Sequence, residues 1–231
     1  MSRRLKRLMD VVLAGTALVL LSPVMAGVAL TVLLTEGRPI LYRQRRPGLH
    51  GVPFELVKFR TMLPEVVDAK GRPIDADKRM TRVGYLLRKT SLDELPELYN
   101  VLRGDMSLVG PRPLLMQYLE LYTPEQARRH DVRPGITGWA QVHGREDLPF
   151  EERFVLDVWY VDHWSLGLDL KILLQTIRLV PTGAGVGERS EPDRYFEGSR
   201  PAGAEAASTA GSPDPSAAAG DDEPAAGTMA S

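Results

Sequence analysis

The segment Val11–Leu34 reads VVLAGTALVLLSPVMAGVALTVLL, carries no charged side chain, and is interrupted near its middle by Ser22 and Pro23. As a continuous helix it would reach about 36 Å, enough to span a hydrocarbon core of about 30 Å. Pro23 removes a backbone donor, so a bend is expected there, and the Ser22 hydroxyl is suited to bond a carbonyl freed at membrane depth. We therefore predict a helix–break–helix that enters a membrane.

Basic residues flank this segment on both sides. They are Arg3, Arg4, Lys6 and Arg7 before it, and Arg38, Arg43, Arg45 and Arg46 after it. Positive residues near a membrane segment tend to stay in the cytoplasm, so both ends are predicted to be cytoplasmic and the hairpin to re-enter the leaflet it came from. A kinked single-pass anchor and a cleaved signal peptide are the alternatives, although a signal peptide has a shorter apolar region.

Composition agrees with one domain plus appendages. The 231 residues contain no cysteine, which excludes disulfides and thiolate metal sites. Residues 183–231 hold nine acidic and three basic residues, a net charge of −6, which leaves +5 for residues 1–182. A basic body is attracted to anionic lipid headgroups. The Ala/Gly/Ser/Pro-rich tail has few large apolar residues from about Gly198 onward, so we expect it to be mostly disordered.

Between the membrane segment and the tail, the pattern is typical of a mostly helical α+β protein with a small α/β domain. Residues 39–44 and 54–59 are predicted to be short strands joined by a turn-prone loop. Helices are predicted at 81–89, 92–104, 114–122, 151–164 and 168–180, the second closed by Gly104. The last of these segments is suited either to the core or to the membrane plane.

The chemistry is concentrated in TSLDELPELYNVLRGDMSLVGPRP, Thr90–Pro113. Asp93 and Glu94 are adjacent carboxylates near a helix start, where free amides favour the ionised form. An ionised Asp is a usable nucleophile, and a neighbouring Glu is suited to hold a divalent cation or a proton. The tetrapeptide beginning at Ser91 also fits a capping box, which by itself is the simpler interpretation.

Several arginines change that balance. Pro111 and Pro113 hold Arg112 on a stiff, extended backbone, which suits bidentate recognition of a phosphate. Arg60 and Arg88 are further candidates for phosphate contact. Arginines around a carboxylate pair on a membrane-bound body predict a site for two phosphate-bearing substrates.

The chain resembles the monotopic polyprenyl-phosphate phosphoglycosyl transferases, a family of bacterial sugar transferases. The matching features are Lys6-Arg7-x-x-Asp10, Ser22-Pro23, KFRTM from Lys58, the Thr90–Pro113 stretch, RPGITGWAQVHGR from Arg133, and DVWYVDHWSLGLDLKIL from Asp157. The resemblance covers residues 6–182 and corresponds to a minimal catalytic form. It implies a re-entrant membrane element at 1–36 and a cytoplasmic catalytic domain at 37–182, followed by the tail at 183–231.

The resemblance also implies a reaction. A phosphosugar passes from a UDP-sugar to undecaprenyl phosphate, giving the lipid diphosphate sugar and UMP, with Mg²⁺ required. Asp93 would form a covalent phosphosugar intermediate. Glu94 would bind Mg²⁺, together with Asp93, or would assist the removal of a proton. The expected substrate-binding residues are Lys58, Arg60, Arg88, Arg112, Arg133 and Arg145.

Other polar residues are expected to be structural. His130, His143 and His163 have no spacing that indicates a metal site. Asp157 and Asp169 match the family pattern but are also suited to cap or pair within the helical C-terminal half. Gly135 and Gly138 permit a tight backbone.

Two other functions stay open. A glycosyltransferase that moves the sugar alone would release UDP, although no strand, Gly-rich turn and helix unit for a nucleotide is present. A non-catalytic scaffold of a polysaccharide assembly complex is the second. The expected location is the bacterial inner membrane, facing the cytoplasm, with membrane lipid and downstream glycosyltransferases as partners and no nucleic acid. The sugar and the glycan pathway cannot be read from the sequence.

Overall fold

The computed structural model describes residues 3–64, 79–144 and 148–179. All of them belong to one compact unit, and the predicted acidic tail lies outside the described residues. Helix α1 (Arg3–Glu36) comes first and is followed by an antiparallel hairpin of β1 (Leu41–Pro47) and β2 (Pro53–Phe59). The pairing runs from Leu41 opposite Phe59 to Pro47 opposite Pro53. The two predicted strands are confirmed, but β1 begins two residues later and ends three residues later than predicted, so the hairpin extends into the predicted loop.

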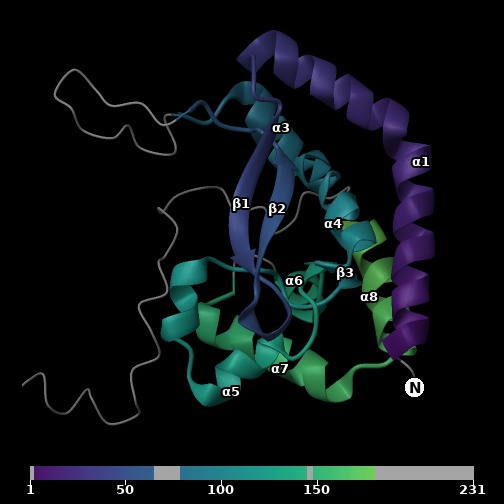
Figure 1. Cartoon of the computed structure of the whole chain (residues 1–231), viewed down its shortest axis with the longest axis vertical. Coiled ribbons are helices and arrows are strands. Elements are labelled where there is room, and N and C mark those ends of the chain that lie inside the picture. Colours follow the sequence, from purple (N-terminus) through teal and green to yellow (C-terminus); the bar gives the residue numbers. More distant parts are fainter. Residues whose placement is uncertain (1–2, 65–78, 145–147, 180–231) are drawn as a thin grey trace, which may run out of the picture. The chain divides into compact units, whose positions relative to one another are not determined.

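Helix α1 is one helix of 34 residues with Pro23 inside it. Figure 1 shows that it changes direction partway along its length. Pro23 has no N–H for the carbonyl of Val19, four residues earlier, and the Ser22 hydroxyl donates to that carbonyl at 2.8 Å. Helical geometry therefore continues through the proline, and the predicted two helices are one bent helix.

The composition of α1 permits a membrane crossing. It is the one helix in the described part of the chain that is long and apolar enough to cross a bilayer, and only 11% of its most apolar window is buried. Its outward side chains include Val19, Leu20 and Leu34, each more than 70% exposed. Large apolar side chains exposed along one helix indicate contact with lipid or a partner.

The remaining helices follow the hairpin. Helices α3 (Arg82–Lys89) and α4 (Glu97–Arg103) flank the 3₁₀ turn η2 (Leu92–Glu94). The predicted helix 92–104 is divided because Pro96 cannot donate within it, so α4 starts after the proline and ends at Gly104 with φ of 95°. The 3₁₀ helices are η1 (Leu49–Gly51), η3 (Met116–Glu120) and η4 (Arg128–His130); the other helices are α5 (Pro124–Ala127), α6 (Trp139–His143), α7 (Phe150–His163) and α8 (Leu166–Leu179).

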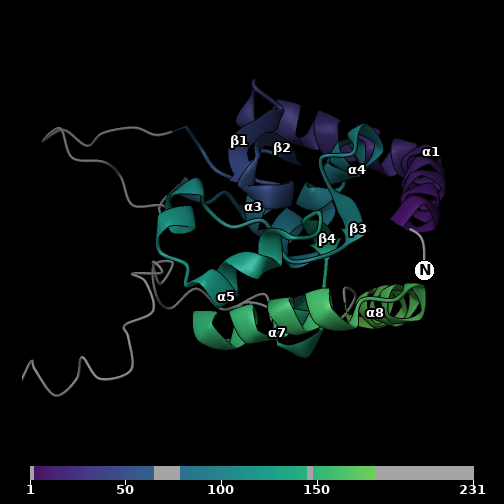
Figure 2. The same ribbon diagram turned by 60° about the horizontal axis from the view of Figure 1, so that its bottom comes forward.

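A second small sheet is absent from the sequence-based prediction. β3 (Ser107–Val109) pairs in parallel with β4 (Gly135–Thr137), and in Figure 2 both lie between α4 and α8. Gly110 and Gly135 bring the two segments together backbone to backbone, since a Cβ added to Gly135 would lie 2.1 Å from the Gly110 nitrogen. The expectation that Gly135 permits a tight backbone is therefore confirmed.

The core forms around α1 and these strands. The largest buried apolar cluster joins Ala14 of α1 to Phe54, Leu98 and Ile172, and a second cluster joins Val32 to Phe59 and Leu87. Both halves of α1 therefore pack on the domain while their other side stays exposed. Helix α8 corresponds to the segment for which the sequence allowed either the core or the membrane plane. It contributes Ile172 to the core and leaves Leu170, Leu174 and Ile177 exposed.

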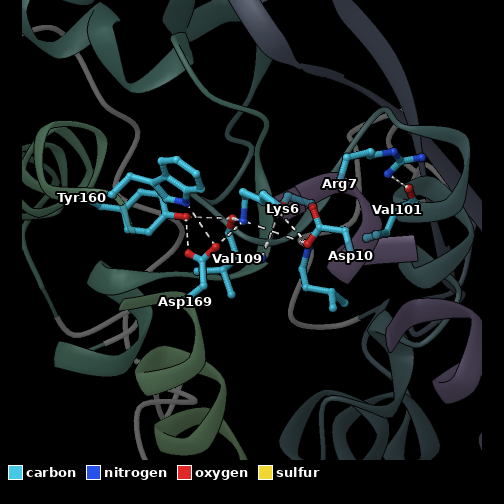
Figure 3. Close-up of polar contacts among 10 residues, drawn as sticks. Lys6, Arg7, Asp10, Val101, Val109, Tyr160 and Asp169 are labelled. Carbon is cyan, nitrogen blue, oxygen red and sulfur yellow. Dashed lines mark hydrogen bonds and ion pairs between the residues drawn. The ribbon is translucent and has the colours of Figure 1, made fainter. Parts of the chain in front are cut away.

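The first turns of α1 are tied to this core by polar contacts (Figure 3). Lys6 Nζ lies 2.7 Å from Asp169 Oδ2 of α8 and donates to the Val109 carbonyl at 3.2 Å. The Tyr160 hydroxyl donates to Asp169 Oδ1 at 2.6 Å. Asp10 accepts from the Leu108 amide at 3.2 Å. Asp169 therefore bonds within the helical C-terminal half, as expected, through Tyr160, but its ion pair is with Lys6 at the other end of the described chain.

Candidate active site

Asp93 and Glu94 lie on the short turn η2, between α3 and α4. The turn follows Ser91, whose φ of 56° is left-handed, a conformation that costs a non-glycine residue of order 1 kcal/mol. In this conformation the Ser91 side chain makes no capping hydrogen bond. The capping-box interpretation is therefore wrong, because Glu94 directs its carboxylate elsewhere.

Glu94 is held by two cations from distant segments. Lys58 Nζ of β2 donates to Glu94 Oε1 at 2.9 Å, and Arg112 Nη2 donates to the same oxygen at 2.6 Å. Burial by itself would raise the pKa of Glu94, but Arg112 and Lys58 outweigh it and hold the pKa well below its usual range. Glu94 is therefore an ionised carboxylate that organises the basic residues.

Glu97 belongs to the same cluster. Its Oε1 lies 3.1 Å from Lys58 Nζ, and its side chain is almost fully buried at the start of α4. Burial raises the pKa of Glu97 to about 7, although Lys58 lowers it. For Lys58, burial lowers the pKa, but Glu94 and Glu97 raise it above its usual value. The sequence analysis missed Glu97; its position one helical turn after Glu94 was the available signal.

Asp93 differs from its neighbour Glu94 in the direction of its pKa shift. It is 6% exposed, and burial together with the charge of Glu94 raises its pKa to about 6, while Lys58, Arg88 and Arg112 lower it. The expectation that a helix start stabilises its ionised form is not met, because η2 is a single short turn and burial dominates. At neutral pH Asp93 is still mostly ionised, and it retains the basicity of a buried carboxylate.

Arg46 of β1 is a second residue that the sequence analysis did not place in the site. Its Nη2 donates to Gln44 Oε1 at 2.6 Å, and its buried Nε bonds to no residue in the described ranges. Burial and the nearby charge of Arg112 lower the pKa of Arg46. The signal was strand periodicity, since residues 44 and 46 share one face of β1.

The other predicted basic residues divide into two groups. Arg88 contributes its charge to Asp93 and donates from Nε to Thr61 Oγ1 at 2.9 Å. Arg60 donates instead to the carbonyls of Gly37 and Arg38 at the end of α1, at 3.0 and 3.1 Å. Arg133 Nε donates to the Gly104 carbonyl at the end of α4, at 2.8 Å.

The free carbonyls at helix ends explain this difference. The carbonyls of Gly37 and Arg38 follow the last residue of α1, and that of Gly104 follows the last residue of α4, where side-chain donors are favourable, so Arg60 and Arg133 bond to the backbone there rather than to Asp93. The predicted binding residue Arg145 lies outside the described residues.

The histidines have structural contacts. His143 Nδ1 and His163 Nδ1 bond to the carbonyls of Trp139 and Trp159, one helical turn earlier, at 2.8 and 2.9 Å. Burial lowers the pKa of His130 to about 4, so its ring is neutral at physiological pH. These contacts agree with the structural roles expected from the sequence.

The carboxylates of the site are too few to surround a metal ion by themselves, but they suit an ion that also binds a substrate phosphate. Within the ranges that the structure describes, no three Asp, Glu, His or Cys side chains are close enough to hold a metal by themselves. Mg²⁺ commonly uses only one or two carboxylates together with substrate phosphates. Asp93 and Glu94 supply oxygen donors of this kind, so they fit a Mg²⁺ that a phosphate ligand completes.

The arrangement suits chemistry at phosphorus. Phosphoryl transfer depends mainly on positioning and on neutralising charge on non-bridging oxygens. The site combines a basic, buried carboxylate at Asp93 with Lys58, Arg88 and Arg112 around it. Such a site can bind an anionic phosphate ester and present a nucleophile to its phosphorus.

Comparisons with known proteins point to the same chemistry. Residues 1–183 match a family model described as bacterial sugar transferase. Over 182 residues the chain is 55% identical to an uncharacterized sugar transferase, EpsL, of Bacillus subtilis, covering 79% of this chain and 90% of that protein.

Two relatives carry more specific names. The chain is 45% identical to the UDP-glucose:undecaprenyl-phosphate glucose-1-phosphate transferase of Caulobacter vibrioides, covering 74% of this chain and 68% of that protein. It is 40% identical to the undecaprenyl-phosphate galactose phosphotransferase of Salmonella typhimurium, covering 78% of this chain but 41% of that protein.

Proposed function

Because the chain belongs to the bacterial sugar transferase family and is an enzyme of that type, we propose that it transfers a sugar 1-phosphate from a UDP-sugar to undecaprenyl phosphate and releases UMP. The names of the relatives from Caulobacter vibrioides and Salmonella typhimurium support both the lipid acceptor and the transfer of a phosphosugar. One relative is named for glucose and the other for galactose, so the sugar itself is left for experiment.

The observation that carries the proposal is the state of Asp93. It is a buried carboxylate with a pKa of about 6, faced by the charges of Lys58, Arg88 and Arg112. A glycosyltransferase that moves the sugar alone reacts at the anomeric carbon, so it needs no nucleophile directed at phosphorus. A covalent route through phosphorus uses both the carboxylate and the cations around it.

The proposed reaction has two displacements. An Asp93 oxygen attacks the sugar-bearing phosphorus, an Asp93–phosphorus bond forms, and the phosphoanhydride bond to UMP breaks with its electron pair leaving on UMP. A phosphate oxygen of undecaprenyl phosphate then attacks the same phosphorus, and the Asp93 carboxylate is released. Arg112 and Lys58 both donate to the neighbouring Glu94, and they are the proposed cations that share the charge of the transferring group.

Mg²⁺ is part of the proposal. When bound, it would neutralise charge on the phosphate oxygens, and Asp93 and Glu94 are the residues proposed to hold it. Glu94 is the better anion of the two because Arg112 and Lys58 hold its pKa low.

We further propose that α1 is re-entrant, with both of its ends on the cytoplasmic side of the bacterial inner membrane. Both ends are tied to one domain: Lys6 pairs with Asp169 near the start, and Arg60 donates to Gly37 just past the end. Basic residues flank both ends, and Pro23 bends the middle. A hairpin of this kind would bring the domain to a lipid phosphate whose tail stays in the bilayer.

The product would be the first lipid-linked sugar of a bacterial polysaccharide or glycoconjugate. Downstream glycosyltransferases that extend a lipid diphosphate sugar are therefore the proposed consumers of the product. One relative is named for the transfer of glucose 1-phosphate and the other as a galactose phosphotransferase, both with undecaprenyl phosphate in the name.

The test is nucleotide release by purified protein in nanodiscs with undecaprenyl phosphate, Mg²⁺ and a panel of UDP-sugars that includes UDP-glucose and UDP-galactose. We expect UMP with one donor, and a phosphosugar adduct on Asp93 by mass spectrometry when the lipid is omitted. The Asp93→Asn variant should lose both signals, whereas Asp131→Asn, at an exposed carboxylate, should keep them.

Release of UDP in place of UMP would contradict the proposal and assign the protein to glycosyltransferases that move the sugar alone. Full activity of pure Asp93→Asn would rule out Asp93 as the nucleophile. No product across the panel would favour a scaffold role.

A further inference from the structure

A buried ion pair contacts the backbone of the Gly110–Pro113 loop, which carries Arg112. Arg129 of η4 is 2% exposed, and its Nη2 lies 2.6 Å from Asp157 Oδ2 of α7. The same Nη2 donates to the backbone carbonyl of Arg112 at 2.8 Å. One guanidinium nitrogen therefore joins α7 to the loop that presents Arg112.

Arg129 has little freedom to turn away from this position. Its Nε donates to Asp157 Oδ2 at 3.1 Å, its Nη1 donates to the Tyr122 hydroxyl at 3.0 Å, and its guanidinium carbon lies 5.4 Å from the ring centre of Phe154. All three guanidinium nitrogens of the buried Arg129 therefore donate hydrogen bonds. Rotation of the side chain would separate a buried charge from its partner Asp157, so we expect Arg129 to stay in this orientation.

The loop itself offers few backbone donors. Pro111 and Pro113 lack N–H groups, so the loop cannot pair as a regular strand on both sides of Arg112. Its sheet-side contacts are Gly110 N to Thr137 O at 2.9 Å and Gly135 N to Pro111 O at 3.0 Å. The Arg129 bond adds a contact at the backbone carbonyl of Arg112 itself.

We infer that Arg129 and Asp157 are positioning residues for the transferase reaction: the pair fixes the backbone of Arg112 so that its guanidinium meets Glu94 and the phosphate of the donor. This inference rests on the proposed function for its kinetic consequence. The contacts run in one chain, from Asp157 to Arg129, from Arg129 to the Arg112 carbonyl, and from the Arg112 guanidinium to Glu94.

A pair that only held α7 to η4 would predict something different. Its loss would lower stability and would affect kcat/KM equally whatever residue stood at 112. A positioning pair acts through Arg112. Loss of the pair should therefore no longer change kcat/KM once the Arg112 guanidinium has been removed. A displacement of about 1 Å at a catalytic group can cost about 100-fold in rate, so the effect is measurable.

The experiment compares variants of the full chain in nanodiscs, with the UDP-sugar that gives product. Asp157→Asn leaves Arg129 buried without its carboxylate, so a second variant replaces the pair with apolar residues, Arg129→Met with Asp157→Leu, which often preserves folding. Tyr122→Phe is the matched control, because it removes a contact of Arg129 that does not reach Arg112. Each is made in the wild-type and Arg112→Lys backgrounds.

We expect the apolar pair to lower kcat/KM by about 10- to 100-fold in the wild-type background. In the Arg112→Lys background it should have less than a twofold further effect, and Tyr122→Phe should stay within about twofold of its parent. Equal losses in both backgrounds, or unchanged kcat/KM in a folded apolar-pair variant, would overturn the inference.

A second readout needs no substrate. Hydrogen exchange at the amides of Gly110 and Gly135 should accelerate in the apolar-pair variant but not in Tyr122→Phe, since these two amides make the hydrogen bonds between the loop and the segment of β4. If wild-type protein made no product, the proposed function would fail while this exchange test would still decide the positioning role. Unchanged exchange in the folded apolar-pair variant would contradict it.

Discussion

Lys6 Nζ lies 2.7 Å from Asp169 Oδ2, although the two residues are 163 positions apart in the chain. The contact joins the first turns of the apolar helix α1 to α8, the last helix that the structure describes. Asp169 is fully buried and also accepts from Tyr160 and from Trp164 Nε1. The start of α1 is therefore built into the folded domain.

This geometry predicts a large stability effect at Asp169. Asp169→Asn should lower the free energy of unfolding by about 3 kcal/mol, because it takes from the mostly buried Lys6 ammonium the nearer of its two carboxylates and leaves only Asp10, at 4.0 Å. Arg43→Gln, which removes an exposed pair with Glu55, should cost less than about 1 kcal/mol. Denaturant titration in detergent measures both. Equal effects of the two variants would show that the Lys6 contact is no stronger than a surface pair.

The raised pKa of Asp93 predicts that the site destabilises the fold at neutral pH. Folding raises the pKa from 3.8 to about 6, so the native state binds more protons between these values and loses stability as pH rises through this window. The side chain of Asn cannot ionise, so Asp93→Asn should exceed wild type in unfolding free energy by about 3 kcal/mol at pH 8 but not at pH 4. A stability difference independent of pH would contradict the raised pKa.

The same pKa predicts the acid limb of the pH–rate profile. If Asp93 must be ionised, kcat/KM should fall as pH drops through about 6. Lys58 lowers the pKa of Asp93, so Lys58→Met should move this limb to higher pH in addition to slowing the reaction. A limb that moved to lower pH, or stayed in place, would show that Lys58 does not act on the ionisation that limits the rate.

Two arginines that look equivalent in the sequence should behave differently. Arg112→Lys keeps the charge but loses the planar guanidinium whose Nη2 donates to Glu94, so kcat/KM should fall by about 100-fold with little change in stability. Arg133→Lys should lower stability, because Arg133 caps α4 at Gly104, and should change kcat/KM by less than about threefold. Steady-state kinetics and thermal unfolding, run on both variants, separate the two roles.

The re-entrant topology predicts labelling from one side. The chain has no cysteine, so Ser2→Cys and Tyr42→Cys each create a single thiol on either side of α1. In inverted inner-membrane vesicles, an impermeant maleimide should label both thiols, and in right-side-out vesicles it should label neither. Labelling of the two thiols from opposite sides would establish a single-pass helix.

Much of the local structure could be predicted because it depends on local patterns. The hairpin of β1 and β2, the helix starting after Thr81, and the turn at Gly104 follow from periodicity and from capping residues. The parallel pair of β3 and β4 could not be predicted. Each strand has three residues and pairs with a partner far along the chain, so nothing local marks it.

For the candidate site, the sequence determined that Asp93 and Glu94 stand together, that arginines are numerous around them, and that an apolar segment broken by Ser22 and Pro23 precedes them. Adjacency in the chain is enough for such statements. Tertiary structure alone decided which cations reach the carboxylates, selecting Lys58 and Arg112 while Arg60 and Arg133 bond to helix ends.

Tertiary structure also decided the ionisation of the carboxylates. Asp93 and Glu94 are neighbours with the same charge, yet folding raises the pKa of one and lowers that of the other. The cause is three-dimensional: both are buried, but Glu94 accepts directly from Lys58 and Arg112, whereas burial dominates at Asp93. A sequence fixes which groups can ionise, but burial and the distances to other charges, which exist only after folding, set the energy of each ion.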